Sequence, residues 1–200
     1  MREVELKALV PDLAQARERL VRAGATLAYG GRLEDRRYDT PDRQLAARDH
    51  VLRLRVYRGV RDGAAERALL DFKGPTGYDA GYKVREELSV GATDPDTLAL
   101  LLDRLGYVVT REIDRDIEQY ELRDATVRFE RYPRMDVLVE VEGSPAAIEA
   151  AIVDVGLPRA GFSADRLPAF VARFQARTGE RAAICDRELR GDFRFRTSDA

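Results

Sequence analysis

The chain has 200 residues, of which 44% are hydrophobic and 35% are charged, and its formal net charge is −2 at pH 7. This composition suits one globular domain that is long enough to bury a sizeable core. Because acidic and basic residues nearly balance, the composition excludes a nucleic-acid-binding protein that relies on a broad basic surface. Cys185 is the only cysteine and His50 the only histidine, so neither an intramolecular disulfide nor a zinc site is expected.

The hydropathy pattern bears on where the protein works. No apolar run approaches the roughly 18 residues that a membrane-spanning helix needs, and no signal peptide precedes the first predicted strand. A lone cysteine suits a reducing compartment. We therefore expect a soluble, cytoplasmic protein that binds neither nucleic acid nor membranes.

The first predicted element is a strand over residues 1–10. Side chains alternate between the two faces of a strand, so Glu3, Glu5 and Lys7 share one face and aliphatic residues share the other. A Pro-Asp pair then opens a predicted helix that ends near Ala23. Three charges on one face are as typical of an ordinary surface strand as of a functional site. The same arrangement, however, recurs along the chain.

The next predicted feature is a hairpin. Residues 25–29 and 34–39 are predicted to pair around Gly30 and Gly31, because adjacent glycines favour a turn. Six further strands are predicted over residues 51–57, 68–73, 82–90, 108–122, 126–131 and 137–141, and three further helices over residues 94–106, 146–155 and 164–178.

Roughly eight strands, most of them joined by hairpin-length links, predict an α+β fold in which an eight-stranded antiparallel sheet closes into a β-barrel with helices packed on its outside. Closure explains the charge pattern, because the charged faces converge inside and the aliphatic faces pack under the helices. The predicted inner residues are Glu3, Glu5, Lys7, Arg53, Arg55, Lys73, Lys83, Arg85, Glu87, Arg115, Arg128, Glu130, Glu140 and Glu142.

Two interpretations fit such an interior. Cross-strand salt bridges on a solvated sheet would produce the same alternation, and each would contribute little. In the functional interpretation, Arg and Lys bind a polyanion and the carboxylates bind a hard divalent cation, Mg²⁺ or Mn²⁺. The combination points to metal-assisted phosphoryl or nucleotidyl transfer.

The motifs also resemble those of a known family. Glu3-x-Glu5-x-Lys7 is similar to the ExExK signature of the CYTH superfamily, the triphosphate tunnel metalloenzymes, which includes class IV adenylate cyclases, thiamine triphosphatases and inorganic triphosphatases. The resemblance covers about residues 1–178. It continues in order through Tyr38-Asp39-Thr40-Pro41, Leu52-Arg53-Leu54-Arg55, Phe72-Lys73-Gly74-Pro75, Lys83-x-Arg85-x-Glu87 and Glu140-x-Glu142.

The resemblance implies a tunnel that holds a triphosphate together with one or two metal ions. It implies metal-ligand roles for Glu3, Glu5, Glu130, Glu140 and Glu142. It implies phosphate contacts for Lys7, Arg53, Arg55, Lys73, Lys83, Arg85 and Arg115, and catalytic roles for Lys7, Arg53, Lys73 and Glu87. Two positions depart from the family pattern: Ile117 stands where a second base is usual, and Glu130 stands where aspartate is common.

The leading hypothesis is a Mg²⁺- or Mn²⁺-dependent enzyme most like a class IV adenylate cyclase, in which the ribose 3′-hydroxyl of ATP attacks the α-phosphorus and pyrophosphate leaves. The alternative chemistry is hydrolysis of tripolyphosphate, thiamine triphosphate or a nucleoside triphosphate. A third hypothesis is a polyphosphate-binding module without turnover. An exposed outer strand face is compatible with a homodimer.

Smaller signals complete the expectations. Residues 1–178 are expected to form the tunnel domain, and residues 179–200 a loose polar tail. Tyr78 and Tyr82 are interpreted as hairpin packing residues, with stacking on a nucleobase or thiamine ring as the alternative. His50 is interpreted as structural or solvent-exposed.

Overall fold

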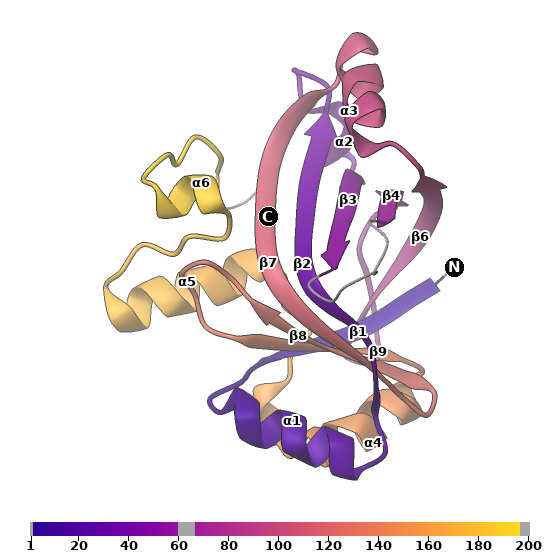
Figure 1. Ribbon diagram of the computed structural model, residues 1–200, viewed down its shortest axis with the longest axis vertical. Helices are drawn as coiled ribbons and strands as arrows, with labels where there is room; N and C mark the ends of the chain where they lie inside the picture. Colours follow the sequence, from indigo (N-terminus) through magenta and orange to yellow (C-terminus); the bar gives the residue numbers. More distant parts are fainter. Residues whose placement is uncertain (1, 60–66, 197–200) are drawn as a thin grey trace.

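The computed structural model describes residues 2–59 and 67–196, with side chains from Val4 onward in the first strand, so the Glu3 side chain lies outside the described residues. The sequence also predicts a hairpin loop over residues 58–66, where Gly59 and Gly63 favour a turn, and most of that stretch lies outside the described residues as well. The strands are β1 (Arg2–Leu9), β2 (Thr26–Asp39), β3 (Val51–Gly59), β4 (Arg67–Lys73), β5 (Gly77–Asp79), β6 (Tyr82–Ala92), β7 (Val108–Leu122), β8 (Ala125–Arg131) and β9 (Leu138–Gly143) (Figure 1). The helices are α1 (Leu13–Arg22), α2 (Gln44–Ala47), α3 (Pro95–Arg104), α4 (Pro145–Val155), α5 (Leu167–Thr178) and α6 (Asp186–Leu189), with a 3-10 turn at Arg159–Gly161.

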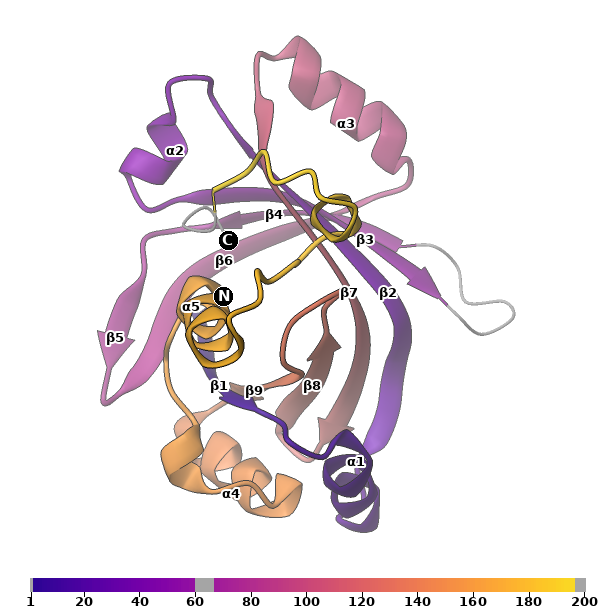
Figure 2. The same cartoon turned by 90° about the vertical axis from the view of Figure 1, so that its left-hand side faces the viewer.

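Eight strands form a closed antiparallel barrel, which confirms the predicted fold. Their order is β1, β9, β8, β7, β2, β3, β4 and β6, and β6 pairs in turn with β1. The short strand β5 pairs with β6 outside this ring. Figure 2 shows the ring of strands, with α5 and the C-terminal segment passing in front of it. Closure leaves the barrel strands without an unpaired edge.

The predicted hairpin at Gly30 and Gly31 is wrong, because residues 26–39 form the single long strand β2. Gly31 is needed at this point because neighbouring atoms pack closely against its backbone. A Cβ atom at Gly31 would lie 2.5 Å from the carbonyl oxygen of Arg58 and 2.7 Å from the hydroxyl of Tyr29. Gly31 therefore marks a crowded point inside a strand, where only a residue without a side chain fits.

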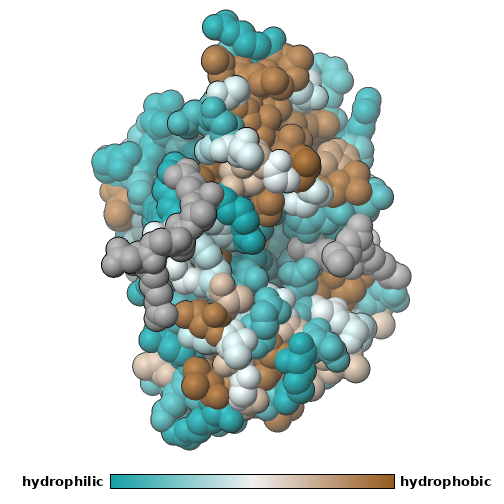
Figure 3. Space-filling view, turned by 45° about the vertical axis from the view of Figure 1, so that its right-hand side comes forward, coloured by the Kyte–Doolittle hydropathy of each residue, from teal (hydrophilic) through white to brown (hydrophobic). Residues whose placement is uncertain are grey.

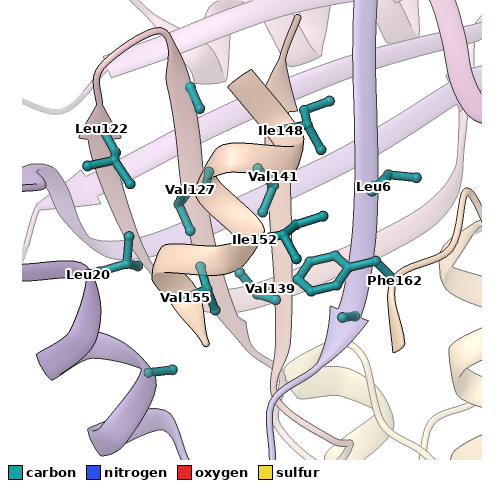
Figure 4. Close-up of a cluster of buried hydrophobic side chains, with 14 of the residues drawn as sticks. Leu6, Leu20, Leu122, Val127, Val139, Val141, Ile148, Ile152, Val155 and Phe162 are labelled. Atoms are coloured by element: carbon teal, nitrogen blue, oxygen red, sulfur yellow. The ribbon is translucent and has the colours of Figure 1, made fainter. Parts of the chain in front are cut away.

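The main hydrophobic core lies outside the barrel, beneath α1 and α4 (Figure 4). Helix α4 is capped at its N-terminus by Ser144, whose hydroxyl accepts a hydrogen bond from the backbone of the first turn, and at its C-terminus by Gly156 in the left-handed conformation. Its residues Ile148 and Ile152 pack on outward side chains of β8 and β9, among them Val141. The aliphatic faces of these strands thus point outward, as the alternation predicts.

Helix α3 covers part of the opposite outer face, where Leu102 packs against Leu54 and Val56 of β3. Leu88 and Val90 of β6 remain more than half exposed, and hydrophobic surface gathers over this upper part of the molecule (Figure 3). The homodimer that this face suggested stays a prediction. Among the described residues, no helix has the length and apolar character required to cross a membrane.

The segment after α5 is packed, so the expectation of a loose tail is wrong for residues 182–189. Ala183 and Ile184 are buried, and the Ile184 carbonyl accepts a hydrogen bond from the backbone of Asp114 at 2.8 Å. Glu188 forms a buried bidentate ion pair with Arg111 of β7, at 2.6 and 3.0 Å. A short apolar run between charged residues is enough to anchor this segment. The domain boundary at residue 178 stays a prediction.

Candidate active site

The barrel interior holds a cavity of about 410 Å³, a size typical of small-molecule sites. Its lining includes Glu5, Lys7, Arg53, Arg55, Lys73, Lys83, Arg85, Glu87, Arg115, Arg128, Glu130, Glu140 and Glu142. The Glu3 backbone lies opposite Arg85 in the β1–β6 register, and its side chain is outside the described part of the chain. The structure therefore brings together every predicted inner residue whose side chain it describes.

Three of the predicted phosphate-contact arginines meet on one carboxylate, Asp35 of β2. Arg55 Nε lies 2.9 Å from Asp35 Oδ1, and Arg115 Nη1 lies 3.0 Å from Asp35 Oδ2. Arg53 Nη1 lies 3.5 Å from the same Oδ2. Burial opposes ionisation of Asp35, which is 1% exposed, but the three guanidinium charges outweigh burial and hold its pKa well below the ordinary value.

Two further carboxylates extend this arrangement around the barrel wall. Asp71 of β4 accepts hydrogen bonds from Arg53 at 2.6 and 3.1 Å, and its other oxygen accepts from Ser89 of β6. On the opposite side, Glu130 of β8 accepts from Arg115 Nε at 2.9 Å. We call Arg53, Arg55 and Arg115, together with Asp35, Asp71 and Glu130, the arginine belt. It alternates acids and bases across β4, β3, β2, β7 and β8.

Both carboxylate oxygens of Glu130 accept hydrogen bonds. Its Oε1 accepts from Arg115, and its Oε2 accepts from the hydroxyl of Tyr132 at 2.7 Å. Burial, reinforced by the Glu130 charge, raises the pKa of Tyr132 well above its ordinary value, so this hydroxyl remains a donor. In the structure Glu130 orients Arg115 and Tyr132, and its metal-ligand role stays a prediction.

The carboxylates on β1 and β9 lie on the other wall. Glu5 is directly opposite Glu142 in the strand register, and Lys7 is directly opposite Glu140. Glu5 forms an ion pair with Lys83, and Glu140 forms ion pairs with Lys7 and Arg128. Burial opposes ionisation of Glu5, but the neighbouring cations, Lys83 foremost, keep its pKa below the ordinary value.

The chemistry of this wall fits a hard divalent cation, which prefers carboxylate oxygens. Like charges directly opposite on neighbouring strands, such as Glu5 and Glu142, destabilise a sheet unless something neutralises them. In the structure Lys83 does this for Glu5. Among the described residues, no three His, Cys, Asp or Glu side chains are already gathered as a metal site. The carboxylates on β1 and β9 thus have the oxygen atoms that a hard divalent cation prefers, and the strand register places Glu5 opposite Glu142. The side chain of Glu3 lies outside the described residues.

Sequence reasoning missed several charged residues at the end of the barrel where α2 and α5 lie (Figure 2). Arg37 and Arg43 line the cavity there. Arg166, which precedes α5, donates to both carboxylate oxygens of Asp49 at 2.8 Å. The Asp49 carbonyl accepts from Arg85 at 2.7 Å. These contacts fix the position of one predicted phosphate-binding arginine.

Ile117 shares the inner face of β7 with Arg115, as the alternation predicts. It packs with Leu33 and Tyr57 in a small apolar cluster and does not line the cavity. The base that the family usually has at this position would therefore point into apolar packing in this chain.

The remaining aromatic candidates differ from one another. The half-buried His50 ring packs edge-on against Phe72, with centroids 5.1 Å apart, which agrees with a structural role. Tyr82 is buried and donates to Glu149 at 2.6 Å, as a packing residue would. Tyr78, by contrast, is 65% exposed.

A closed antiparallel barrel with this charged interior defines the class of tunnel proteins that the sequence motifs resemble. The CYTH domain model matches residues 1–151, so the chain belongs to the CYTH domain family. No curated protein matches the chain.

Several solved structures share the fold. The PH1819 protein from Pyrococcus horikoshii OT3 is 24% identical, with a TM-score of 0.67 over 82% of this chain and 94% of that one. A putative adenylate cyclase from Vibrio parahaemolyticus is 18% identical, with a TM-score of 0.70 over 85% and 97%. The putative adenylyl cyclase HpAC1 from Hippeastrum, described as having a dominant triphosphatase activity, is 16% identical, with a TM-score of 0.59 over 88% and 95%. At these identities the likeness concerns the fold alone.

Proposed function

We propose that this protein is an enzyme that binds a triphosphate-bearing substrate in the barrel cavity and acts on it with the help of Mg²⁺ or Mn²⁺. The observation that carries the proposal is the convergence of cations from β3, β4, β6 and β7, and of carboxylates from β1 and β9, on one cavity. Basic side chains outnumber acidic ones in its described lining. A cavity of this charge attracts a polyanion.

The arginine belt supports the binding part of the proposal. Arg53, Arg55 and Arg115 are held by carboxylates before any ligand arrives, so little side-chain freedom is lost when phosphate binds. Within the described residues, Nη2 of Arg115 donates no hydrogen bond, which leaves a donor for a phosphate oxygen. The belt thus supplies preorganised cations for a triphosphate.

The carboxylates that would hold the metal are Glu5, Glu140 and Glu142, with Glu3 next along β1. When bound, a divalent cation neutralises phosphate charge and polarises the phosphoryl oxygen. Lys7 and Lys83, which now pair with these carboxylates, would then be available to phosphate oxygens.

Glu87 is the candidate proton acceptor. It lies opposite Lys73 in the β4–β6 register, with 3.1 Å between Lys73 Nζ and Glu87 Oε2, and Arg53 lies 3.5 Å away. The two cations hold Glu87 in place at the cavity wall. In that place it can accept the proton of an attacking water or hydroxyl.

Hydrolysis of the terminal phosphate is the better-supported reaction. The Tyr57 ring, which lines the cavity, is covered by Arg67 at 4.2 Å and packed edge-on by Tyr29. Tyr132 is buried next to Arg115. Neither of these two rings offers an open face to a nucleobase, which favours a terminal phosphate over a nucleoside beside them. Cyclisation of ATP, the expectation from sequence, remains the second candidate because it needs only the same metal and cations.

Incubating the protein separately with ATP, thiamine triphosphate and tripolyphosphate, each with Mg²⁺ or Mn²⁺, tests the proposal. Orthophosphate identifies a hydrolase, cyclic AMP with pyrophosphate identifies a cyclase, and binding without product identifies a binding module. Arg55→Met should abolish turnover, whereas Arg58→Met, on the exposed outer face of the same strand, should not. Absence of both binding and turnover would overturn the proposal.

A further inference from the structure

Tyr132 directly follows β8 and lies between the tunnel cavity and an apolar cluster. The residue is 9% exposed and lines the cavity. Its ring packs in a cluster with Ile113 of β7, Phe170 and Phe174 of α5, and Ile184 of the C-terminal segment. A ring that is packed among these elements has a fixed position, so its hydroxyl group has a fixed position as well.

The Tyr132 hydroxyl joins this cluster to the arginine belt. It donates a hydrogen bond to Glu130 Oε2 at 2.7 Å, and Arg115 Nε donates to Glu130 Oε1 at 2.9 Å. Arg115 Nη1 donates to Asp35 Oδ2 at 3.0 Å. Two carboxylates thus hold Arg115, and its Nη2 donates to no residue of the described chain.

Glu130 has a second basic neighbour that competes for its carboxylate. Arg128 Nε lies 3.5 Å from Glu130 Oε1, and among the described residues this buried Nε atom has no hydrogen-bond partner. Tyr132 is the only described donor to Oε2, so its hydroxyl sets the rotation of the carboxylate. Without that donor, Oε2 would be a buried acceptor without a partner, which is costly. The carboxylate would then turn towards Arg128 and release Arg115.

We infer that Tyr132 is a positioning residue that acts through Glu130 to hold Arg115 for phosphate binding, and that Glu130 is not a metal ligand. The inference rests on the proposed function and deepens it, because it assigns the support of one phosphate-binding arginine. A metal ion on Glu130 would take the oxygen atoms that Arg115 and Tyr132 use, and would leave two buried donors without acceptors. The carboxylates of β1 and β9 remain the metal candidates.

Residues beyond the matched CYTH domain take part in this support. The family match ends at residue 151, whereas Phe170, Phe174 and Ile184 lie after it and pack in the cluster that holds the Tyr132 ring. Helix α5 and the C-terminal segment thus contribute to the position of Arg115 through this ring.

Tyr132→Phe tests the inference, because it removes the hydroxyl and keeps the ring in its cluster. Calorimetry at saturating Mn²⁺ should show tripolyphosphate binding weakened about tenfold, the effect of losing one charge-assisted contact. Mn²⁺ titrated without tripolyphosphate should bind within about twofold of the wild type. In turnover, KM for tripolyphosphate should rise by a similar factor while kcat stays within about twofold, because Arg115 binds phosphate both before and during the reaction.

Tyr82→Phe is the matched control. Tyr82 is equally exposed, at 9%, and donates to Glu149 at 2.6 Å, but it lies in the core outside the barrel. This variant should bind tripolyphosphate like the wild type. Equal affinities in Tyr132→Phe and the wild type overturn the inference. A loss of Mn²⁺ affinity as large as the loss of tripolyphosphate affinity also overturns it, since Glu130 would then be a metal ligand.

Arg115→Lys shows whether Tyr132 acts through the arginine. Lysine lacks the guanidinium fork that bridges Glu130 and Asp35, so adding Tyr132→Phe to this variant should weaken tripolyphosphate binding by less than a further twofold or so. A loss of about tenfold in both backgrounds would mean that Tyr132 acts independently of Arg115, and would overturn the inference. If Arg115→Lys fails to fold, the comparison of Tyr132→Phe with Tyr82→Phe still decides.

Catalysis and positioning can fail separately. If the wild type binds tripolyphosphate but releases no product, the proposed catalysis fails, and the calorimetric comparison still decides the role of Tyr132. If the wild type turns tripolyphosphate over and Tyr132→Phe binds it equally well, only the role of Tyr132 fails. A wild type that binds no tripolyphosphate overturns both.

Discussion

Asp35 and Arg115 form a buried ion pair inside the barrel, with 3.0 Å between Oδ2 and Nη1, and each side chain is at most 5% exposed. The carboxylate is shared with Arg53 and Arg55, so one negative charge contacts three cations, of which Arg53 also pairs with Asp71 and Arg115 with Glu130. Such an arrangement is stable only while the carboxylate stays ionised, because removal of one partner leaves buried charge uncompensated.

Asp35→Asn is therefore expected to lower the free energy of unfolding by about 3 kcal/mol. Urea denaturation measures this change. Tripolyphosphate should restore part of the loss, because a bound polyanion neutralises the same arginines and binds only the folded state. Glu34→Gln is the matched control on the outer face of β2: its ion pair with Arg58 is partly exposed and should contribute below about 1 kcal/mol. Equal effects of the two substitutions would contradict the role of Asp35.

The free energy of unfolding should also depend on pH through the ionisation of Asp35. The pKa of Asp35 in the folded protein lies well below its value of about 3.9 in an unfolded chain, so its contribution is present above that value and is lost as pH falls through and below it. Unfolding free energies measured between pH 7 and pH 3 should fall less steeply in Asp35→Asn than in the wild type. Parallel curves would show that Asp35 does not control acid stability.

Ile117→Arg should destabilise the protein by at least about 2 kcal/mol, because it places a charge among Leu33 and Tyr57. Thermal unfolding and tripolyphosphate binding measure the two possible effects separately. Ile117→Val, which only shortens the side chain, should cost about 1 kcal/mol. Tighter binding of tripolyphosphate by Ile117→Arg would show that this position faces the phosphates after all.

The metal prediction separates two neighbouring glutamates of β9. Glu142→Gln and Glu140→Gln should both raise the Mn²⁺ concentration needed for half-maximal activity, by about tenfold, because each removes a charged oxygen donor. Glu140→Gln should also lower the unfolding midpoint, because Glu140 is buried between Lys7 and Arg128. Glu121→Gln, exposed on β7, is the control. An unchanged Mn²⁺ requirement in both variants would remove β9 from the metal site.

The packed C-terminal segment supplies a further prediction. Glu188→Gln breaks a bidentate pair with the buried Arg111 and should lower the free energy of unfolding by about 3 kcal/mol. Asp192→Asn, which pairs with exposed Arg194, should have little effect. Chemical denaturation of both variants provides the comparison. A neutral Glu188→Gln would mean that the segment adds no stability through this pair.

The barrel and most of its inner face could be predicted from sequence because alternation survives in β1, β3, β6 and β9. Arg53 and Arg55, for example, are separated by an aliphatic residue, so their common face is plain. In β2 the signal fails, because Asp35 and Arg37 lie beside the charged Glu34 and Arg36. Both faces of this stretch are charged, and only the closed barrel distinguishes the inner pair.

Other features depend on residues that are distant in sequence and close in space, so the residue pattern alone does not predict them. The crowding at Gly31 comes from Arg58 and Tyr29, and without those neighbours two glycines look like a turn. The apolar run of the C-terminal segment is short and lies between charged residues, and one of these, Glu188, finds its buried partner in Arg111, 77 residues earlier in the chain. The openness of Tyr78 and the burial of Tyr82 likewise differ although the two residues lie four positions apart.

Closure of the barrel through β1 has a consequence for how the molecule is assembled. The partners of β1 are β6 and β9, and β9 begins only at Leu138. During synthesis from the N-terminus, the edge of β1 that pairs with β9 therefore stays unpaired until most of the chain has left the ribosome. Pairing between such distant segments predicts slow folding. Until β9 arrives, the open edges of β1 and β8 are where nascent chains would associate with one another.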